Sequence, residues 1–351
     1  MKQVELDVAV SSQAPTEWNR WVYENSQYAG ARQLACRSKL YEIEHDGKSI
    51  FLSCEKSKNR VAGALISWIP PQNSSVLRNI ISLITGVGNG RLVVFEGPVI
   101  SEQRFEVLSS LFLAVDDVAK SMRASSITFN ALPDAYVAKG QDFWEGTFLA
   151  SGYEKHDWLT SVVNLQTEED AYFKSLRAKE RNTIRKCQKA GVSMLKCDTL
   201  ELYLEDFCRN YYEGQWSDER QESCEKQWEH YDPDHFSFFV AKTSDGEVLG
   251  TLGTYHFAGY VTVRLINRTA VCRQLKLPVQ DFLHWSVMNH HRRQRDACFD
   301  LAGVAPSPAG EKEKGIRFFK EKWGGALRPA PSFFKDRRPS WLTLLHKILL
   351  V

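Results

Sequence analysis

Hydrophobic and polar residues alternate in blocks along the first half of the chain, and these blocks predict a regular series of elements. The predicted order is strands over 49–54, 61–68 and 91–95, a helix over 101–121, a strand over 126–130 and a helix over 143–150. In the first helix, apolar residues recur at helical spacing, and we expect these to face the core: Phe105, Leu108, Leu111, Phe112, Val115 and Val118. The second helix ends near Gly152, a residue suited to a left-handed terminator.

The second half of the chain repeats this order. Strands are predicted over 238–241, 248–256 and 260–267, then a helix over 278–291, a strand over 297–301 and a helix over 315–323. The spacing from Ile127 to Gly152 in the first half equals the spacing from Phe299 to Gly324 in the second. This repetition indicates an internal duplication, and the alternative is two ordinary α/β domains that share the order by chance.

Composition supports two domains of a globular protein. A chain of 351 residues is long for a single core, and 43% hydrophobic with 25% charged residues is an ordinary balance. The formal net charge is only +2, so affinity for a polyanion must come from a local patch. The eight cysteines form no CxxC pair, and no Cys/His set has the spacing of a metal site. Because the N-terminus also lacks a secretory signal pattern, we expect reduced thiols, no metal and a cytoplasmic protein.

Two shorter apolar stretches bear on membrane contact. No stretch reaches the ~20 apolar residues of a membrane span, but residues 76–85 and 341–351 each place apolar side chains on one helical face. Docking of both helices on the core is one interpretation. The alternative is peripheral contact with the inner face of a membrane.

The segment that joins the two halves is strongly basic. Residues 172–192 read YFKSLRAKERNTIRKCQKAGV, and Glu180 is the one acid among seven basic residues. If the segment is one helix, Arg177, Arg181 and Arg185 share a face, where three guanidinium groups suit phosphate oxygens. We therefore predict a phosphate site here, and the alternative is a solvated basic face.

Motifs in both halves resemble one known family. The segment SLRAKERNTIRKCQKAGV (175–192) resembles the LR-x-K-x-R-x-x-IRKA-x-K-x-GV signature of the FemABX family. Residues 299–303 (FDLAG) with 315–325 (GIRFFKEKWGG) resemble its C-terminal signature, and residues 143–153, which end in LASGY, resemble the close of its first domain. No long heptad insertion is present, so the chain is most similar to members without a coiled-coil arm.

The resemblance implies an α/β fold of two tandem GNAT-like (acetyltransferase-like) domains with mixed sheets flanked by helices. The expected boundaries are 1–160 for the first domain, 161–335 for the second with the basic helix at its start, and 336–351 for an amphipathic tail. FemABX proteins are aminoacyl-tRNA-dependent transferases of peptidoglycan bridge formation. The resemblance thus implies an aminoacyltransferase that uses aminoacyl-tRNA and no cofactor. Its acceptor would be a phosphate-bearing peptidoglycan precursor or a natural-product amine.

Two alternatives come from other function classes. The first is an acyl-CoA-dependent GNAT N-acyltransferase, for example in polysaccharide biosynthesis, which would use acetyl-CoA or another acyl-CoA. The turn that would cradle the CoA pyrophosphate reads RQLKLP (273–278), where Lys276 and Pro278 replace the glycines that such a turn needs. The second is a binding module that keeps the fold without catalysis.

Site residues are predicted from the same motifs. Lys320, in the matched FK position, is expected to donate to a phosphate or to the developing oxyanion. Glu96 and Asp300 are the candidate bases, and Asp300 has the alternative role of bracing the loop at Gly303. The residues expected to bind substrate or its phosphates are Arg177, Lys179, Arg181, Arg185 and Gly303.

Overall fold

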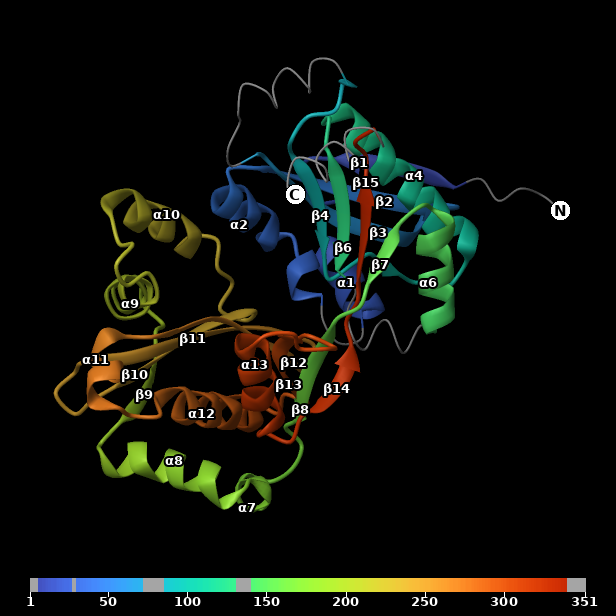
Figure 1. The fold of residues 1–351 in the computed structure, drawn as a ribbon. Coiled ribbons are helices and arrows are strands. Elements are labelled where there is room, and N and C mark those ends of the chain that lie inside the picture. The colour runs from blue at the N-terminus through green and yellow to red at the C-terminus, as the bar shows by residue number, and fades with distance from the viewer. Residues whose placement is uncertain (1–5, 27–29, 72–84, 131–139, 340–351) are drawn as a thin grey trace. The chain divides into compact units, whose positions relative to one another are not determined.

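The computed structural model describes residues 6–26, 30–71, 85–130 and 140–339. The chain forms two compact units (Figure 1): the first contains the chain up to Asp157 and again from Ala330, and the second runs from Trp158 to Pro329. The predicted amphipathic helix over 76–85 lies outside the described residues apart from Thr85, and the tail 341–351 lies outside them entirely.

The first unit is a mixed sheet with helices. Its strands are β1 (Asp7–Ser11), β2 (Lys48–Lys56), β3 (Asn59–Ile69), β4 (Arg91–Phe95), β5 (Val99–Ile100), β6 (Ser126–Asn130), β7 (Glu154–His156) and β15 (Ser332–Asp336). Its helices are α1 (Trp18–Asn25), η1 (Ala31–Gln33), α2 (Cys36–His45), α4 (Phe105–Ser121) and α6 (Gln141–Ala150). The strand order is β1-β2-β3-β4-β6-β15-β7, with β5 paired to β3. Only the pair β4–β6 is parallel among these strands.

The second unit has the same plan. Its strands are β8 (Leu159–Asn164), β9 (Ser193–Lys196), β10 (Phe236–Lys242), β11 (Val248–Phe257), β12 (Tyr260–Arg268), β13 (Cys298–Val304) and β14 (Ala326–Pro329). Its helices are α7 (Glu169–Ser175), α8 (Ala178–Lys189), η2 (Leu202–Cys208), α9 (Arg209–Tyr211), α10 (Asp218–Trp228), α11 (Ala270–Leu275), α12 (Val279–Arg293) and α13 (Glu311–Glu321). The order is β14-β8-β13-β12-β11-β10-β9, and β12–β13 is its parallel pair.

The predicted order of a meander, a helix, a strand and a helix is therefore confirmed in both units. The second predicted boundary is wrong, because residues 330–335 do not belong to the second unit. After β14 the chain returns to the first sheet, where β15 lies between β6 and β7. Correspondingly, β8 follows β7 in the chain but lies between β13 and β14 (Figure 1). The first unit thus takes its strand β15 from the segment that follows the second unit, whereas the second unit is formed by one continuous stretch of the chain.

Aromatic residues fill the core of the first unit. Phe333 on β15 stacks on Phe148 of α6, with 4.0 Å between ring centroids. The residues of α4 predicted to face inward are buried, except Phe105. That side chain is 51% exposed, because the helix begins at this residue and its buried residues start only at Val107.

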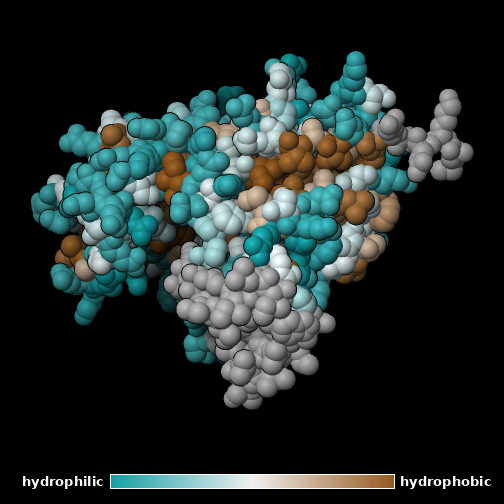
Figure 2. Space-filling model, turned by 90° about the horizontal axis from the view of Figure 1, so that it is seen from above, coloured by the Kyte–Doolittle hydropathy of each residue, from teal (hydrophilic) through white to brown (hydrophobic). Residues whose placement is uncertain are grey.

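The surface is mixed in character. Figure 2 shows hydrophilic residues over most of the face in view, interrupted by patches of hydrophobic residues. Among the described helices, none combines the length and the apolar character needed to cross a membrane.

Buried histidines in the second unit predict acid sensitivity. Burial lowers the pKa of His256 and of His284 to about 4, from 6.5 in an exposed imidazole. Between these values the unfolded chain binds protons that the folded chain excludes, so stability falls as the pH falls from about 6.5 to about 4. At pH 5 each group should cost about 2 kcal/mol.

The measurement is the free energy of unfolding in urea at pH 7.5 and pH 5.0, for the wild type and for His284→Phe. The phenylalanine cannot titrate, so the variant should lose about 2 kcal/mol less than the wild type over this interval. Equal losses in both proteins would show that His284 does not control the acid response.

Candidate functional site

The two parallel strands of the second sheet part from each other after a short paired segment. Pairing of β12 with β13 ends at Thr262 and Asp300, although the strands continue to Arg268 and Val304. In the first sheet, β4 and β6 instead pair from Arg91 to Phe95, along the whole of β4. A parted parallel pair opens a gap at the middle of a sheet, where a ligand can reach main-chain atoms.

Both parted strands carry a bulge near the gap. On β12, Thr251 and Gly253 of β11 face Asn267 and Arg264, so one residue is extra. Leu265 there has a φ of 52°, in the left-handed region. On β13, a register shift lies between Asp300 and Gly303, where Ala302 has a φ of 65°. Bulges bend a strand and leave the extra residue out of the ladder, and they are frequent beside active sites.

A cavity of about 650 Å³ lies at this gap, within the second unit. Its lining comes from β12, β13, the start of α12 and α13: Ile266, Arg268, Pro278, Val279, Gln280, Asp281, His284, Leu301, Lys312, Gly315, Ile316, Phe319 and Lys320. Six of these residues have apolar side chains and six have polar or charged ones, and the remaining residue is Gly315. This volume is typical of small-molecule sites.

Lys320 lies at the cavity, on α13. Its Nζ donates to the carbonyl oxygen of Gly303 at 2.6 Å. Burial lowers the pKa of the Lys320 ammonium to about 8, and the nearby Asp300 carboxylate opposes that shift. A partly buried cation at a cavity wall is suited to stabilise a negative charge that forms there.

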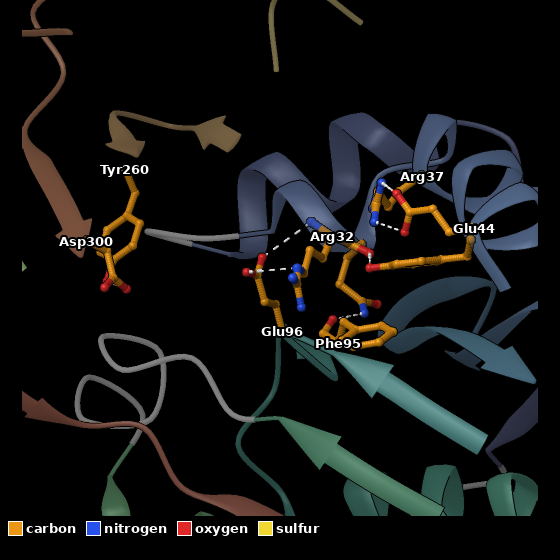
Figure 3. Close-up of polar contacts among 9 residues, drawn as sticks. Arg32, Arg37, Glu44, Phe95, Glu96, Tyr260 and Asp300 are labelled. Atoms are coloured by element: carbon orange, nitrogen blue, oxygen red, sulfur yellow. Dashed lines mark hydrogen bonds and ion pairs between the residues drawn. The ribbon is translucent and has the colours of Figure 1, made fainter. Parts of the chain in front are cut away.

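Asp300 braces the bulge of β13. One of its oxygens accepts from the backbone N–H of Ala302 at 2.7 Å and from the Thr160 hydroxyl. The other accepts from the Tyr260 hydroxyl at 2.8 Å (Figure 3). Burial raises the pKa of the Asp300 carboxyl, and these hydrogen bonds oppose the shift. Because both oxygens are engaged, the geometry favours the bracing role over that of a base.

Gly303 has a steric reason to be glycine. A Cβ on this residue would lie 2.1 Å from Nε1 of Trp158, so the indole packs against its backbone. The Gly303 carbonyl receives the Lys320 ammonium, as described above. Gly303 therefore positions the lysine, and its assignment to phosphate binding stays a prediction.

Glu96, the other candidate base, lies in the first unit. It is buried, and its carboxylate accepts from the backbone N–H of Arg32 at 3.3 Å and lies 3.6 Å from the Arg32 guanidinium (Figure 3). That guanidinium also lies over the Phe95 ring, 4.8 Å from its centroid. The carboxylate is thus held in an ion pair, and its role as a base stays a prediction.

The basic segment differs from the single helix that was predicted. It forms two helices, α7 and α8, separated at Leu176–Arg177, so Arg177 is the residue before α8 rather than part of a helical stripe. The Arg181 guanidinium donates to the carbonyls of Lys174 and Leu176 at the end of α7, and thereby caps that helix.

The remaining arginines of this segment contact aromatic rings. Arg177 pairs with Glu180 at 3.0 Å and lies 5.3 Å from the Phe318 ring centroid on α13. Arg185 lies over the Phe173 ring at 5.2 Å. The exposed face of α8 is still basic and lacks acids, and it carries Lys179, Arg185, Lys186 and Lys189. The predicted three-arginine stripe is therefore wrong in its geometry, whereas a basic surface is present.

The start of α12 carries its own negative charge. Pro278 stands at its N-cap, and Asp281 lies in its first turn. The Asp281 carboxylate accepts from Lys322 at 2.5 Å and from the Thr183 hydroxyl at 3.1 Å. An acid in the first turn occupies the electrostatic position that an incoming pyrophosphate would use.

Sequence reasoning missed most of the cavity. The bulge at Leu265 and the buried His284 have no signature in the sequence, since neither a glycine nor a recognisable motif marks them. His284 Nδ1 donates to the carbonyl of Gln280 at 2.7 Å when the ring is neutral. Among the described residues, no group of three or more His, Cys, Asp or Glu side chains has the arrangement of a metal site.

Comparison with known proteins supports the fold. No family model matches the chain, and no curated protein matches it in sequence. Among solved structures, FemX superposes with a TM-score of 0.70 at 13% identity, over 97% of this chain and 99% of that one. A tandem GNAT protein from the clavulanic acid biosynthesis pathway gives 0.58 at 11% identity, over 95% and 99%. L-PGS from Bacillus licheniformis gives 0.54 at 16% identity, over 96% of each chain. The chain thus has the tandem GNAT-like fold that its motifs predict.

Proposed function

We propose that this protein is an aminoacyltransferase that moves an aminoacyl group from tRNA to the amine of an acceptor. The observation that carries the proposal is the cavity between the parted strands β12 and β13, with the Lys320 ammonium at its wall. The motif containing Lys320 resembles the FemABX signature, and the fold is shared with FemX across nearly the whole chain.

The reaction needs little from the protein beyond positioning and charge stabilisation. The acceptor amine attacks the ester carbonyl, a C–N bond forms, and the C–O bond to the ribose breaks. The proton leaving the amine is balanced by the proton that the ribose oxygen gains. The Lys320 ammonium, mostly protonated at pH 7 with a pKa of about 8, stabilises the oxyanion between these steps. The backbone at the β12 bulge is the second candidate donor.

The start of α12 is poorly suited to the pyrophosphate of acyl-CoA. Pro278 at its N-cap has no N–H to donate, and the Asp281 carboxylate, paired with Lys322, already occupies its first turn. The basic face of α8 suits the phosphates of a nucleic acid better, since it presents cations without intervening acids. An acyl-CoA donor is therefore the second candidate, and aminoacyl-tRNA the first.

The acceptor is proposed more broadly. It is an amine on a phosphate-bearing cell-envelope precursor or on a natural product, as the FemABX resemblance implies. The reaction would take place in the cytoplasm, or at the inner face of the membrane if the acceptor is lipid-linked.

The donor can be identified by direct comparison. Purified protein is incubated with candidate acceptors and with either charged total tRNA or acetyl-CoA, and amide products are detected by mass spectrometry. We expect product from charged tRNA and its loss after RNase treatment, because the donor itself is destroyed. Heat-inactivated protein is the control for uncatalysed transfer. Product from acetyl-CoA in RNase-treated protein would overturn the assignment of tRNA, and no product with either donor would favour a binding module.

A further inference from the structure

Positive charges outnumber negative charges around the cavity. Lys320 lies in its wall, and Arg268 and Lys312 are exposed lining residues, so all three add positive charge. Asp281 is the acid of the lining, and its negative charge is balanced by the buried Lys322, 2.5 Å away. His284 is neutral above pH 5, because burial lowers its pKa to about 4.

The remaining surface of the cavity is mainly hydrocarbon. Val279 and Leu301 are almost fully buried and contribute its inner part. Ile266 and Ile316 also line the cavity and are 41% and 39% exposed. Phe319 and Pro278 complete the apolar lining. Exposed branched side chains beside a concave site gain free energy when an apolar ligand covers them.

We propose that this cavity binds the acyl end of the donor and selects an apolar side chain of medium size over a cationic one. The inference rests on the proposed function and specifies its substrate class. A lysyl or arginyl group would bring a cation into a cavity whose unbalanced charges are positive, and it would lose hydration against hydrocarbon. A branched aliphatic group would instead cover the exposed isoleucines.

The volume of the cavity limits the size of the ligand that it can hold. About 650 Å³ lies in the middle of the range for sites that hold drug-sized ligands. The cavity can therefore hold the amino acid together with the terminal nucleoside of its carrier. Arg268 and Lys312, as exposed cations of the lining, are then placed to meet the carrier's phosphate.

The test measures binding directly, independently of turnover. The probes are non-hydrolysable aminoacyl adenosines, in which an amide replaces the ester, carrying leucyl, alanyl or lysyl groups. Titration calorimetry should show the leucyl probe binding at least about tenfold more tightly than the lysyl probe, which corresponds to ~1.4 kcal/mol. Ile316→Glu, which puts a carboxylate on the wall, should reduce the leucyl preference over lysyl by about tenfold.

A variant that reduces the space in the cavity provides a second test. Gly315 lines the cavity, and a Cβ there meets no heavy atom within 4 Å, so Gly315→Leu fits the helix and extends into open space. It should weaken the leucyl probe about tenfold and leave the alanyl probe within about twofold. The control is Gly146→Leu, at an exposed position of α6 in the first unit where a Cβ also meets nothing within 4 Å. It should change neither probe.

The outcomes separate this inference from the proposed function. Binding of the lysyl probe as tight as that of the leucyl probe, or failure of every probe to bind, overturns the inference. A size variant that behaves like the control also overturns it. The proposed function fails by a different result, transfer from acyl-CoA in RNase-treated protein, which the binding measurements do not affect.

Discussion

Lys320→Met should reduce the rate of transfer by about two to three orders of magnitude, as loss of one oxyanion donor typically does. The methionine keeps much of the hydrocarbon stem and removes the ammonium that donates to Gly303 at 2.6 Å. Folding should be unaffected or slightly favoured, because burial already lowers the pKa of this ammonium to about 8 and so disfavours its charged form in the folded protein. The measurement pairs single-turnover transfer rates with thermal melting.

The matched control is Lys314→Met on the same helix. Lys314 is 57% exposed and pairs with Glu311, so its loss should change neither rate nor melting by a measurable amount. Lys322, two positions after Lys320, does not point into solvent and is unsuitable as a control. It forms a buried pair with Asp281, and its loss would leave a buried carboxylate without its partner. If Lys320→Met transfers at the wild-type rate, the assignment of Lys320 to the active site is wrong.

Phe333→Ala should destabilise the first unit by about 3–5 kcal/mol, the usual cost of emptying a buried phenylalanine site. The ring is fully buried and stacks on Phe148, although it follows the whole second unit in the chain. Urea unfolding followed by tryptophan fluorescence should show the transition of the first unit at lower urea, with that of the second unit little changed.

Phe334→Ala is the control on the same strand. Adjacent residues of a strand face opposite sides of the sheet, and Phe334 is only partly buried. Its loss should cost less than half as much as the loss of Phe333. If the two variants are equally stable, β15 does not contribute to the core in the way described.

The regular elements could be predicted because their residues carry a strong local signal. The strands over 91–95 and 126–130 have the predicted bounds, and the helix 105–121 has a continuous apolar stripe. The strands β7, β14 and β15 could not be found in this way. With three and four residues, β7 and β14 are too short for an alternating pattern, and the places of all three strands depend on pairing with distant strands.

The site shows the same division. Lys320 was predicted as a site residue from a sequence motif, and in the structure it is one of the residues that line the cavity. The predicted stripe of arginines was wrong because the helix is interrupted between Ser175 and Ala178. No glycine or proline in the sequence marks this interruption. Arg181 was assigned to phosphate binding from its charge alone, but in the structure it caps the end of α7. Spacing predicts which residues share a face only when the helix is continuous.

The position of β15 has a consequence for the order in which the protein matures on the ribosome. The second unit contains all its strands in one continuous stretch, from β8 to β14, so it can close as soon as that stretch has emerged. The first unit is synthesised earlier, but the place between β6 and β7 stays open until β15 arrives. During that interval two strand edges are unpaired, which invites pairing with other chains. Domains usually mature from the N-terminus onward; here the unit that is made first is completed last.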